Sequence, residues 1–327
     1  MAKYWEDYTP EQLNTLADTI LLEYRSKGFP YYSRLSKEEC QKLKNDLQKK
    51  SWKGIIHDST IKQTMHGLGA IWAYFPHAWE VQCGKSLTPM QVFNSDELFK
   101  KAILKRLKYG TYVSDSGIRK SLKTASGAQG VSNFRPSAAA AIYDYFEAEN
   151  VYDMSCGYGG RMLGAIISKS VKSYMGVDPC VDTFNGLMLL KEDFSDDTII
   201  DIKNCGSEEF SPEANSIDLC FTSPPYFNTE KYSEEVTQSY KKYPTYNEWI
   251  SGFIGGTVDK CVSALKPNGI LAYNVANTKT SPSLVDDVRQ VLISRNLVDC
   301  RELRLSLSSI MSKGFKYEPV LIFRKPV

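Results

Sequence analysis

The sequence predicts a doubly wound α/β domain, built on a mostly parallel seven-stranded sheet and joined to a mostly helical amino-terminal domain. From about residue 131, short apolar segments alternate with helical ones, which is typical of a parallel sheet covered on both faces. Near the end, two strand segments follow each other without a helix between them, which indicates a closing hairpin. We therefore expect a first domain over residues 1–125 and a second over residues 126–327.

The expected elements of the second domain follow in order along the chain. An alanine-rich helix over residues 137–147 precedes a strand over residues 150–155. A glycine-rich turn leads from that strand into a helix over residues 161–169, and a later helix is expected over residues 283–294. The other strands are predicted over residues 174–177, 198–202, 216–221, 269–275, 298–307 and 319–323.

The amino-terminal part is predicted to be helical. Within residues 10–50, apolar side chains recur at three- and four-residue spacings, the period of one helix face. Ser36, with Glu39 three residues later, forms a capping box that begins one of these helices. A glycine- and serine-containing stretch over residues 121–132 is expected to be a linker or a mobile loop.

Positive charge is concentrated in the first domain. Residues 1–130 carry 20 Lys and Arg against 13 Asp and Glu, whereas residues 131–327 carry 20 against 25. Between Lys100 and Lys123 the one acidic residue is Asp115. Such a cluster would neutralise the phosphates of nucleic acid, although a solvated basic helix face is the plain alternative. The residues expected to contact nucleic acid are Lys101, Lys105, Arg106, Lys108, Arg119, Lys120 and Lys123.

Composition argues against several classes of protein. No apolar stretch approaches the roughly 20 residues of a membrane span, and residues 1–7 lack the apolar core of a secretory signal. The 8 cysteines are scattered singly, without Cys-x-x-Cys or a nearby histidine at ligand spacing. In a chain of this size, that pattern favours reduced thiols over disulfides or zinc. We therefore expect a cytoplasmic protein with no membrane contact and no metal.

A proline-rich corner follows the apolar run over residues 217–221. The residues are Thr222-Ser223-Pro224-Pro225-Tyr226, and two successive prolines end a strand abruptly. The carboxyl end of a strand is where open α/β sheets place their ligands. A short hydroxyl, unpaired backbone carbonyls and an aromatic face are the groups needed to hold an exocyclic amine of a planar base. We call residues 222–226 the elbow.

A glycine loop lies between the first strand and the first helix of the second domain. Its residues 156–160 read Cys-Gly-Tyr-Gly-Gly, without the spacing typical of dinucleotide or triphosphate binders. Such a loop lets a ligand approach the backbone closely. Asp178, at the end of the second strand, is placed to receive ribose hydroxyls, and Asp153 suits a cationic amine. An amine, a ribose and no phosphate together indicate S-adenosylmethionine.

These motifs resemble those of the DNA amino methyltransferases, which methylate cytosine N4 or adenine N6. Ser223-Pro224-Pro225-Tyr226 matches the family's amine-binding motif, and the preceding Thr222 is typical of its cytosine N4 branch. Residues 153–159 match the cofactor loop, with Met154-Ser155 in place of the usual Pro-Phe. The resemblance covers residues 131–327, and it implies a Rossmann-like class I methyltransferase fold with S-adenosylmethionine as cofactor.

The resemblance also implies the remainder of the cofactor site. Residues 133–137 are similar to the segment that closes over the methionine moiety, and residues 205–208 fall where the family contacts adenine. The residues expected to bind the cofactor are Asn133, Phe134, Arg135, Pro136, Asp153, Ser155, Cys156, Gly157, Gly159, Asp178, Pro179, Ser207 and Thr222.

The elbow suggests how the reaction would proceed. Hydrogen bonds from the amine to Ser223 and to the backbone carbonyl of Pro224 would localise the nitrogen lone pair, while Tyr226 stacks on the base. A base inside a duplex must first flip out, so the expected partner is duplex DNA with a flipped target base. Phe227 and Lys231 follow the elbow and are also expected to contact nucleic acid.

Other functions are compatible with the same motifs. With Asn in place of Ser, this kind of elbow serves enzymes that methylate RNA bases or protein glutamine. Transfer of a larger group from a modified sulfonium cofactor would use the same fold. A non-catalytic nucleic-acid-binding module is a further alternative, which the intact Asp153, Asp178 and Ser223 disfavour.

Overall fold

The computed structural model describes residues 8–108, 113–125, 127–195, 197–307 and 316–327. Residues 1–7, on which the expectation about a secretory signal depends, lie outside this range. The chain divides into two compact units, each interrupted in sequence. The first unit consists of Met1–Ser33, Pro76–Ser132 and Glu230–Tyr232, and the second consists of Arg34–Phe75, Asn133–Thr229 and Ser233–Val327.

This division differs from the expected boundary at residue 125. The main segment of the first unit extends to Ser132, and residues 34–75 belong to the second unit. These residues were assigned to the helical domain because their helix and short turns show no strand pattern.

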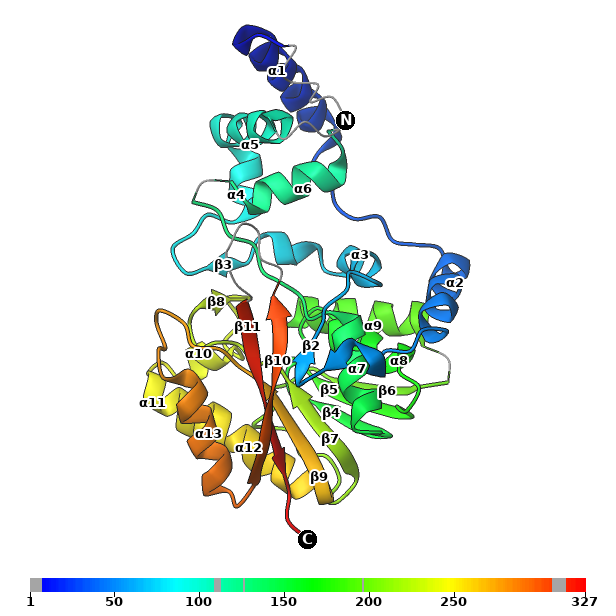
Figure 1. The fold of residues 1–327 in the computed structure, drawn as a ribbon. Helices are drawn as coiled ribbons and strands as arrows, with labels where there is room; N and C mark the ends of the chain where they lie inside the picture. The colour runs from blue at the N-terminus through cyan, green and yellow to red at the C-terminus, as the bar shows by residue number, and fades with distance from the viewer. Residues whose placement is uncertain (1–7, 109–112, 126, 196, 308–315) are drawn as a thin grey trace. The chain divides into compact units, whose positions relative to one another are not determined.

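The second unit contains a nine-stranded sheet in the order β1-β2-β10-β11-β9-β7-β4-β5-β6 (Figure 1). Seven strands correspond to the predicted ones, and the two additional strands, β1 and β2, come from the segment before residue 76. Each of these has two residues, which is too short to show a period in the sequence. The strands are β1 (Ile56–His57), β2 (Thr60–Ile61), β4 (Asn150–Asp153), β5 (Ser173–Val177), β6 (Ile199–Lys203), β7 (Ile217–Thr222), β9 (Leu265–Asn274), β10 (Val298–Leu307) and β11 (Lys316–Arg324).

The predicted parallel sheet and closing hairpin are both present. β6, β5, β4, β7 and β9 pair in parallel, whereas β11 is antiparallel to β9 and to β10. The chain adds β5 and β6 on one side of β4 and β7 and β9 on the other, so the strand order reverses at β4. Such a switch point opens a crevice at the carboxyl ends of the strands. This is the doubly wound, Rossmann-like arrangement that the sequence predicts.

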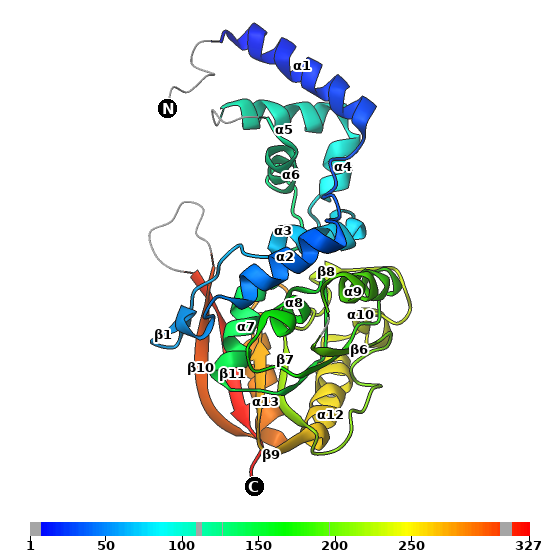
Figure 2. The ribbon, with the colours of Figure 1, turned by 90° about the vertical axis from the view of Figure 1, so that its right-hand side faces the viewer.

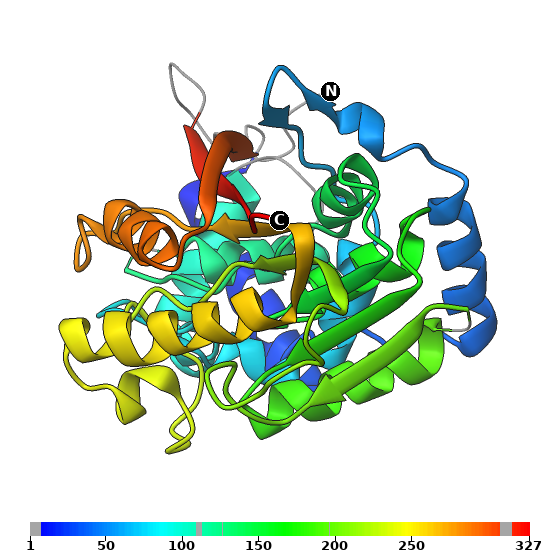
Figure 3. The same ribbon diagram turned by 90° about the horizontal axis from the view of Figure 1, so that it is seen from below.

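Helices cover both faces of this sheet, as Figure 3 shows from below. On one face, the π-helical segment Trp249–Gly255, α12 and α13 pack on β7, β9 and β11 in a continuous apolar core. The helices of this unit are α2 (Lys37–Gln48), α3 (Leu68–Ile71), α7 (Pro136–Tyr145), α8 (Gly160–Ile167), α9 (Val181–Phe194), α10 (Ser239–Lys242), α11 (Tyr246–Glu248), α12 (Gly256–Ala264) and α13 (Leu284–Ser294), with short 3-10 turns at Lys53–Ile55 and Trp72–Tyr74.

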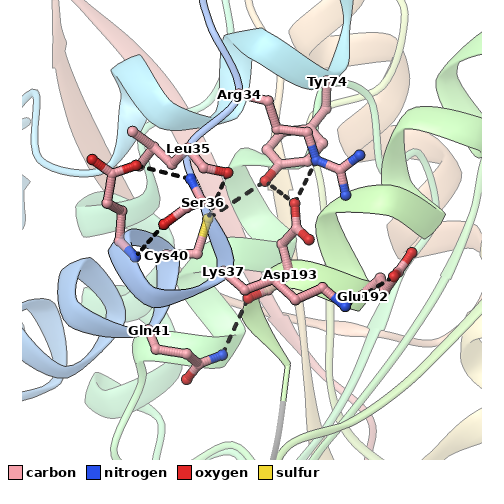
Figure 4. A network of polar contacts seen from close by, with 10 residues as sticks. Arg34, Leu35, Ser36, Lys37, Cys40, Gln41, Tyr74, Glu192 and Asp193 are labelled. Atoms are coloured by element: carbon pink, nitrogen blue, oxygen red, sulfur yellow. Dashed lines mark hydrogen bonds and ion pairs between the residues drawn. The ribbon is translucent and has the colours of Figure 1, made fainter.

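A polar network fixes α2 to α9 and explains why residues 34–75 belong to the second unit (Figure 4). The carboxylate of Asp193 accepts hydrogen bonds from Arg34 Nε and from the Tyr74 hydroxyl, each at 2.6 Å. Gln41 Nε2 donates to the Asp193 carbonyl at 3.1 Å. The predicted capping box of Ser36 and Glu39 begins α2 and is confirmed.

The first unit is mostly helical, as expected (Figure 2). Its apolar core joins α1, α4, α5 and α6 around side chains such as Phe93, Phe99 and Ile103. Its two short strands, β3 and β8, pair antiparallel, and β8 comes from the segment shortly after the elbow. The elements are α1 (Pro10–Lys27), a 3-10 turn at Pro76–Trp79, β3 (Gln82–Cys83), α4 (Pro89–Asn94), α5 (Asp96–Lys108), α6 (Asp115–Lys123) and β8 (Glu230–Lys231).

Three further properties concern the part of the chain that the structure describes. No helix there has the length and apolar character needed to cross a membrane. No group of three or more His, Cys, Asp or Glu side chains is arranged there to hold a metal ion. Each of the eight cysteines, all within that part, has a free thiol.

Candidate functional site

The glycine loop has the backbone conformation that its composition predicts. Gly157 and Gly159 have φ angles of +54° and +71°, which side chains disfavour. A Cβ on Gly160 would lie 1.9 Å from the carbonyl oxygen of Phe134, so this residue must be glycine for the segment before α7 to approach. By contrast, a Cβ on Gly157 would meet one atom within 4 Å, the Ser155 carbonyl oxygen at 3.9 Å. The loop therefore leaves room beside Gly157 for a ligand.

Asp178 holds the glycine loop from the neighbouring strand β5. Its Oδ2 accepts a hydrogen bond from the Gly157 amide at 2.9 Å, and its Oδ1 accepts one from the Cys180 amide at 3.0 Å. Burial raises the pKa of Asp178 to about 6, although the two amide donors oppose that shift. Each carboxylate oxygen keeps a second lone pair that a hydroxyl can use. The position is thus suited to a ribose.

The structure gives Asp153 a role other than the predicted one. The side chain is fully buried, and its Oδ2 accepts hydrogen bonds from Arg161 Nε at 2.8 Å and the Tyr174 hydroxyl at 2.6 Å. Its Oδ1 accepts from the Ser155 amide at 3.1 Å. We expected Asp153 to hold a cationic amine of the cofactor. The cation that it holds is Arg161, from the helix that follows the loop.

The segment before α7 contacts the glycine loop, in agreement with its predicted place. Asn133 Nδ2 donates to the Tyr158 carbonyl at 2.7 Å, and Pro136 is the first residue of α7. Arg135, the residue before α7, is half-buried, and its side chain makes no hydrogen bond or ion pair with any described residue. Burial lowers the pKa of its guanidinium. A half-buried cation without a partner is available to an anionic group such as a carboxylate.

The glycine loop follows β4 and the elbow follows β7, and these adjacent strands end at the same edge of the sheet. β4 and β7 pair in parallel with Tyr152 opposite Cys220, so each strand ends one or two residues beyond that pair. Ser223 is partly exposed, and its hydroxyl makes no hydrogen bond within the described part of the chain. Thr222 is fully buried, and its hydroxyl has no hydrogen-bond partner among the described residues, so its predicted contact with a cofactor would need its backbone. Pro224 is buried, whereas Pro225 and Tyr226 are partly exposed.

Phe227 does not have the predicted contact surface. Its backbone is in the left-handed region, with a φ of +50°, which turns the ring back into the apolar core. The ring lies 5.7 Å from that of Tyr246 and 5.8 Å from that of Trp249. Phe227 is therefore part of the apolar core and does not present its ring to nucleic acid.

Other predicted cofactor residues have buried side chains. The Ser207 hydroxyl pairs with that of Thr257 at 2.7 Å, and the buried Cys156 thiol accepts a hydrogen bond from the Tyr174 hydroxyl at 3.6 Å. Contacts of Ser207 and Cys156 with a ligand would therefore have to come from their backbones. The Ser155 hydroxyl donates to the Met154 carbonyl. Pro179, directly after Asp178, is partly exposed.

Sequence analysis did not identify Arg161 and placed Glu208 only within a segment. Arg161 is the one charged side chain in the otherwise apolar helix α8, a signal that was present in the sequence. The Glu208 side chain is 6% exposed, and it pairs with Lys242 through Oε1. Its Oε2 is buried and makes no hydrogen bond within the described part of the chain.

The basic cluster of the first unit is partly structural. Arg119 is buried, donates to the Pro30 carbonyl at 2.7 Å and lies 3.7 Å from the ring centre of Tyr32. This arrangement contradicts its predicted contact with nucleic acid, because the guanidinium faces its own unit.

Further members of this cluster also have internal contacts. Lys123 donates to the Val131 carbonyl and Lys105 donates to the Thr124 carbonyl. Arg106 Nε is buried against Gly117. The exposed members are Lys101, which pairs with Glu97, and Lys108 and Lys120. Lys231 is exposed on β8 of the same unit.

Comparisons with known proteins concern about half of the chain. No family model and no curated protein matches it. It is similar to the N-methyltransferase NodS from Bradyrhizobium japonicum WM9, with 14% identity and a TM-score of 0.39 over 55% of this chain and 87% of NodS. NodS has also been solved with S-adenosyl-L-homocysteine. TrmN from Thermus thermophilus gives 14% identity and a TM-score of 0.41 over 58% of this chain and 48% of TrmN. A methyltransferase from Pyrococcus furiosus gives 13% identity and a TM-score of 0.38 over 55% and 76%. The fold class follows from the strand order itself.

Proposed function

We propose that this protein is an S-adenosylmethionine-dependent methyltransferase that modifies an exocyclic amine of a DNA base, cytosine N4 ahead of adenine N6. One observation carries the proposal. The Ser223 hydroxyl, free of hydrogen bonds to the described residues, stands on a proline-stiffened corner beside a glycine loop that Asp178 holds. The preference for cytosine depends on Thr222, through the resemblance that this residue carries.

The residues of the site fit S-adenosylmethionine, which when bound supplies an electrophilic methyl group on a sulfonium. Asp178 offers carboxylate lone pairs to ribose hydroxyls, and the space beside Gly157 admits the ligand to the backbone. Glu208 Oε2, which has no hydrogen bond to the described residues, would accept one from the adenine amine if the side chain turned out of its buried position. The unpartnered guanidinium of Arg135 would pair with the carboxylate of the methionine end.

The elbow would prepare the nitrogen for transfer. An exocyclic amine is a weak nucleophile because its lone pair is delocalised into the ring. When the Ser223 hydroxyl and the Pro224 carbonyl each accept a hydrogen bond from the amine, the nitrogen becomes more tetrahedral and its lone pair localises. Two consecutive prolines hold these acceptors in place, so that positioning supplies most of the rate. Tyr226 would stack on the base.

Nucleic acid is the proposed substrate because basic side chains are exposed on the first unit. Lys108 and Lys120 are exposed on α5 and α6, and neither forms an ion pair with a described residue. They would contact phosphates without reading the base sequence. A target base in duplex DNA would have to flip out, at a cost of a few kcal/mol.

The test is methyl transfer from labelled S-adenosylmethionine to mixed-sequence duplex DNA, followed by mass spectrometry of the nucleosides. We expect N4-methyl-2′-deoxycytidine as the product. It should be absent with the Asp178→Ala variant, whose folding is checked by circular dichroism. N6-methyladenine would correct the choice of base. A product found only with RNA would replace DNA as the substrate, and no transfer to any nucleic acid would contradict the proposal.

A further inference from the structure

One guanidinium, that of Arg161, contacts all three segments that form the candidate site. Its Nε donates to Asp153 at the end of β4, and its Nη2 donates to the carbonyl of Ser155, which directly precedes the glycine loop. Its Cζ lies 5.6 Å from the ring centre of Phe134, next to Arg135, and 5.9 Å from that of Phe221, two residues before Ser223. The side chain is 4% exposed.

The loop is thereby fixed at three successive residues. Ser155 is held through its amide by Asp153 and through its carbonyl by Arg161. The Cys156 amide donates to the Val177 carbonyl at 3.0 Å on the neighbouring strand. The Gly157 amide donates to Asp178. Arg161 supplies the one link in this series that comes from the helix after the loop.

We propose that Arg161 is a positioning residue for the cofactor, which sets the shape of the glycine loop by bridging Asp153 and the Ser155 carbonyl. This inference rests on the proposed function, because it assigns Arg161 to binding of S-adenosylmethionine and its product. The Arg161 side chain is buried, so a ligand at the loop would not reach it. It acts through the backbone of residues 155–157, which would contact the cofactor.

The planar fork of arginine is essential to this role. Nε and Nη2 point in fixed directions, so one side chain can bond a carboxylate and a carbonyl at the same time. A lysine at this position would keep the charge beside Asp153, but its single ammonium group cannot reproduce both directed bonds. The conservative variant therefore removes the bridge while it leaves the buried carboxylate paired.

The same unit offers a matched control. Arg34 Nε and the Tyr74 hydroxyl both donate to Asp193 Oδ2 (Figure 4). In the same way, Arg161 Nε and the Tyr174 hydroxyl donate to Asp153 Oδ2. The two networks thus have the same three side chains in the same connection. The Asp193 network joins α2 to α9, and none of its hydrogen bonds among the described residues involves residues 155–160. Asp193 and Tyr74 are buried, whereas the Arg34 side chain is 41% exposed. Changes there report on loss of a carboxylate network that makes no hydrogen bond to residues 155–160.

The experiment measures binding of S-adenosylhomocysteine by calorimetry, with thermal unfolding of each protein alongside. The variants are Arg161→Lys and Tyr174→Phe, and their controls are Arg34→Lys and Tyr74→Phe. We expect the Kd to rise by about tenfold or more in Arg161→Lys and by about threefold in Tyr174→Phe, because a loosened loop loses its preorganisation. The controls should stay within about twofold of the wild type, whatever their change in Tm.

Each outcome decides the matter. An Arg161→Lys protein that is folded and binds with the wild-type Kd would overturn the positioning role alone. Should this variant fail to fold, wild-type affinity in Tyr174→Phe would overturn it equally. A wild-type protein that does not bind S-adenosylhomocysteine would overturn the proposed function, and the inference with it.

Discussion

The amide of Gly157 donates a hydrogen bond to the carboxylate of Asp178 across 2.9 Å, and this bond ties the glycine loop to the end of β5. Gly157 has a φ of +54°, a conformation in which its amide can point at the neighbouring strand. The two residues are 21 positions apart in sequence and adjacent in the sheet. Their contact holds the glycine loop and the carboxylate of Asp178 next to each other, so that both could contact the same ligand.

The titration of Asp178 should make stability depend on pH. Its carboxyl has a pKa raised from 3.8 to about 6 by burial. Between these values the native state retains a proton that the unfolded chain has released, so the free energy of unfolding falls as pH rises through this window. Well above pH 6, the free energy of unfolding should be lower than below pH 4 by about 3 kcal/mol. Urea unfolding of the wild type and Asp178→Asn between pH 4 and 7 checks this. Equal slopes in both proteins would contradict the assignment.

Binding of S-adenosylhomocysteine should follow the same titration in the opposite direction. The ionised carboxylate of Asp178 can accept hydrogen bonds from hydroxyl groups at both oxygens, whereas the protonated form loses part of that capacity. With a pKa of about 6, the ionised fraction rises about tenfold from pH 5 to pH 7. We expect the Kd to fall by about that factor, and to be higher and independent of pH in Asp178→Asn. Calorimetry at both pH values measures it, and a Kd that is constant in the wild type would argue against this role.

Replacement of Ser223 by alanine should separate catalysis from cofactor binding. In the proposed mechanism Ser223 accepts a hydrogen bond from the target amine, and its hydroxyl makes no hydrogen bond to the described residues. Its loss should lower kcat roughly 100-fold through poorer positioning of the amine. The Kd for S-adenosylhomocysteine and the Tm should not change, because the hydroxyl supports neither. Single-turnover methyl transfer and calorimetry measure the two effects. Full activity in Ser223→Ala would remove the elbow hydroxyl from the mechanism.

A methyl group at Gly160 should disturb both the fold and the cofactor site. The new Cβ would lie 1.9 Å from the Phe134 carbonyl oxygen and 2.7 Å from Asn133 Oδ1, so the segment before α7 must move. We expect Gly160→Ala to lose about 1–3 kcal/mol of stability and to bind S-adenosylhomocysteine more weakly. Gly69→Ala is the control, because a Cβ on Gly69 in α3 meets nothing within 4 Å. Denaturant unfolding measures the stability of both variants, and equal stabilities would contradict the clash.

The sequence predicted those features that depend on local pattern. β7 is buried along nearly its whole length, so its residues form one apolar run, and two prolines mark its end. The glycine loop and Asp178 follow their strands in the order that a parallel sheet requires. β1 and β2 were not predicted, because each has two residues and forms through pairing with a distant strand.

The roles of charged side chains were harder to predict, because they depend on partners distant in sequence. Asp153 pairs with a cation from the next helix, and Arg119 reaches backbone carbonyls 88 and 89 residues away. Composition shows how many charges a segment holds but not which of them face inward. Phe227 was assigned to the surface because a positive φ at a phenylalanine cannot be read from its neighbours.

The two exposed lysines Lys108 and Lys120 should account for part of the affinity for nucleic acid. Each phosphate contact that is lost should reduce the slope of log K against log salt by about 1, so Lys108→Ala with Lys120→Ala should reduce it by about 2. Fluorescence anisotropy with a labelled duplex at several salt concentrations measures the slope. Lys172→Ala with Lys203→Ala is the control, because it removes the same charge from the second unit, where these lysines pair with Glu149 and Asp201.

Arg119→Ala should behave differently from the lysine pair. Its loss leaves the Pro30 carbonyl without its donor and removes the contact with Tyr32, so we expect the first unit to lose about 2 kcal/mol of stability. The salt slope measured on folded protein should stay that of the wild type.

If the lysine pair and its control shifted the slope equally, the first unit would not provide the phosphate contacts. A reduced slope in folded Arg119→Ala would instead restore this residue to the interface.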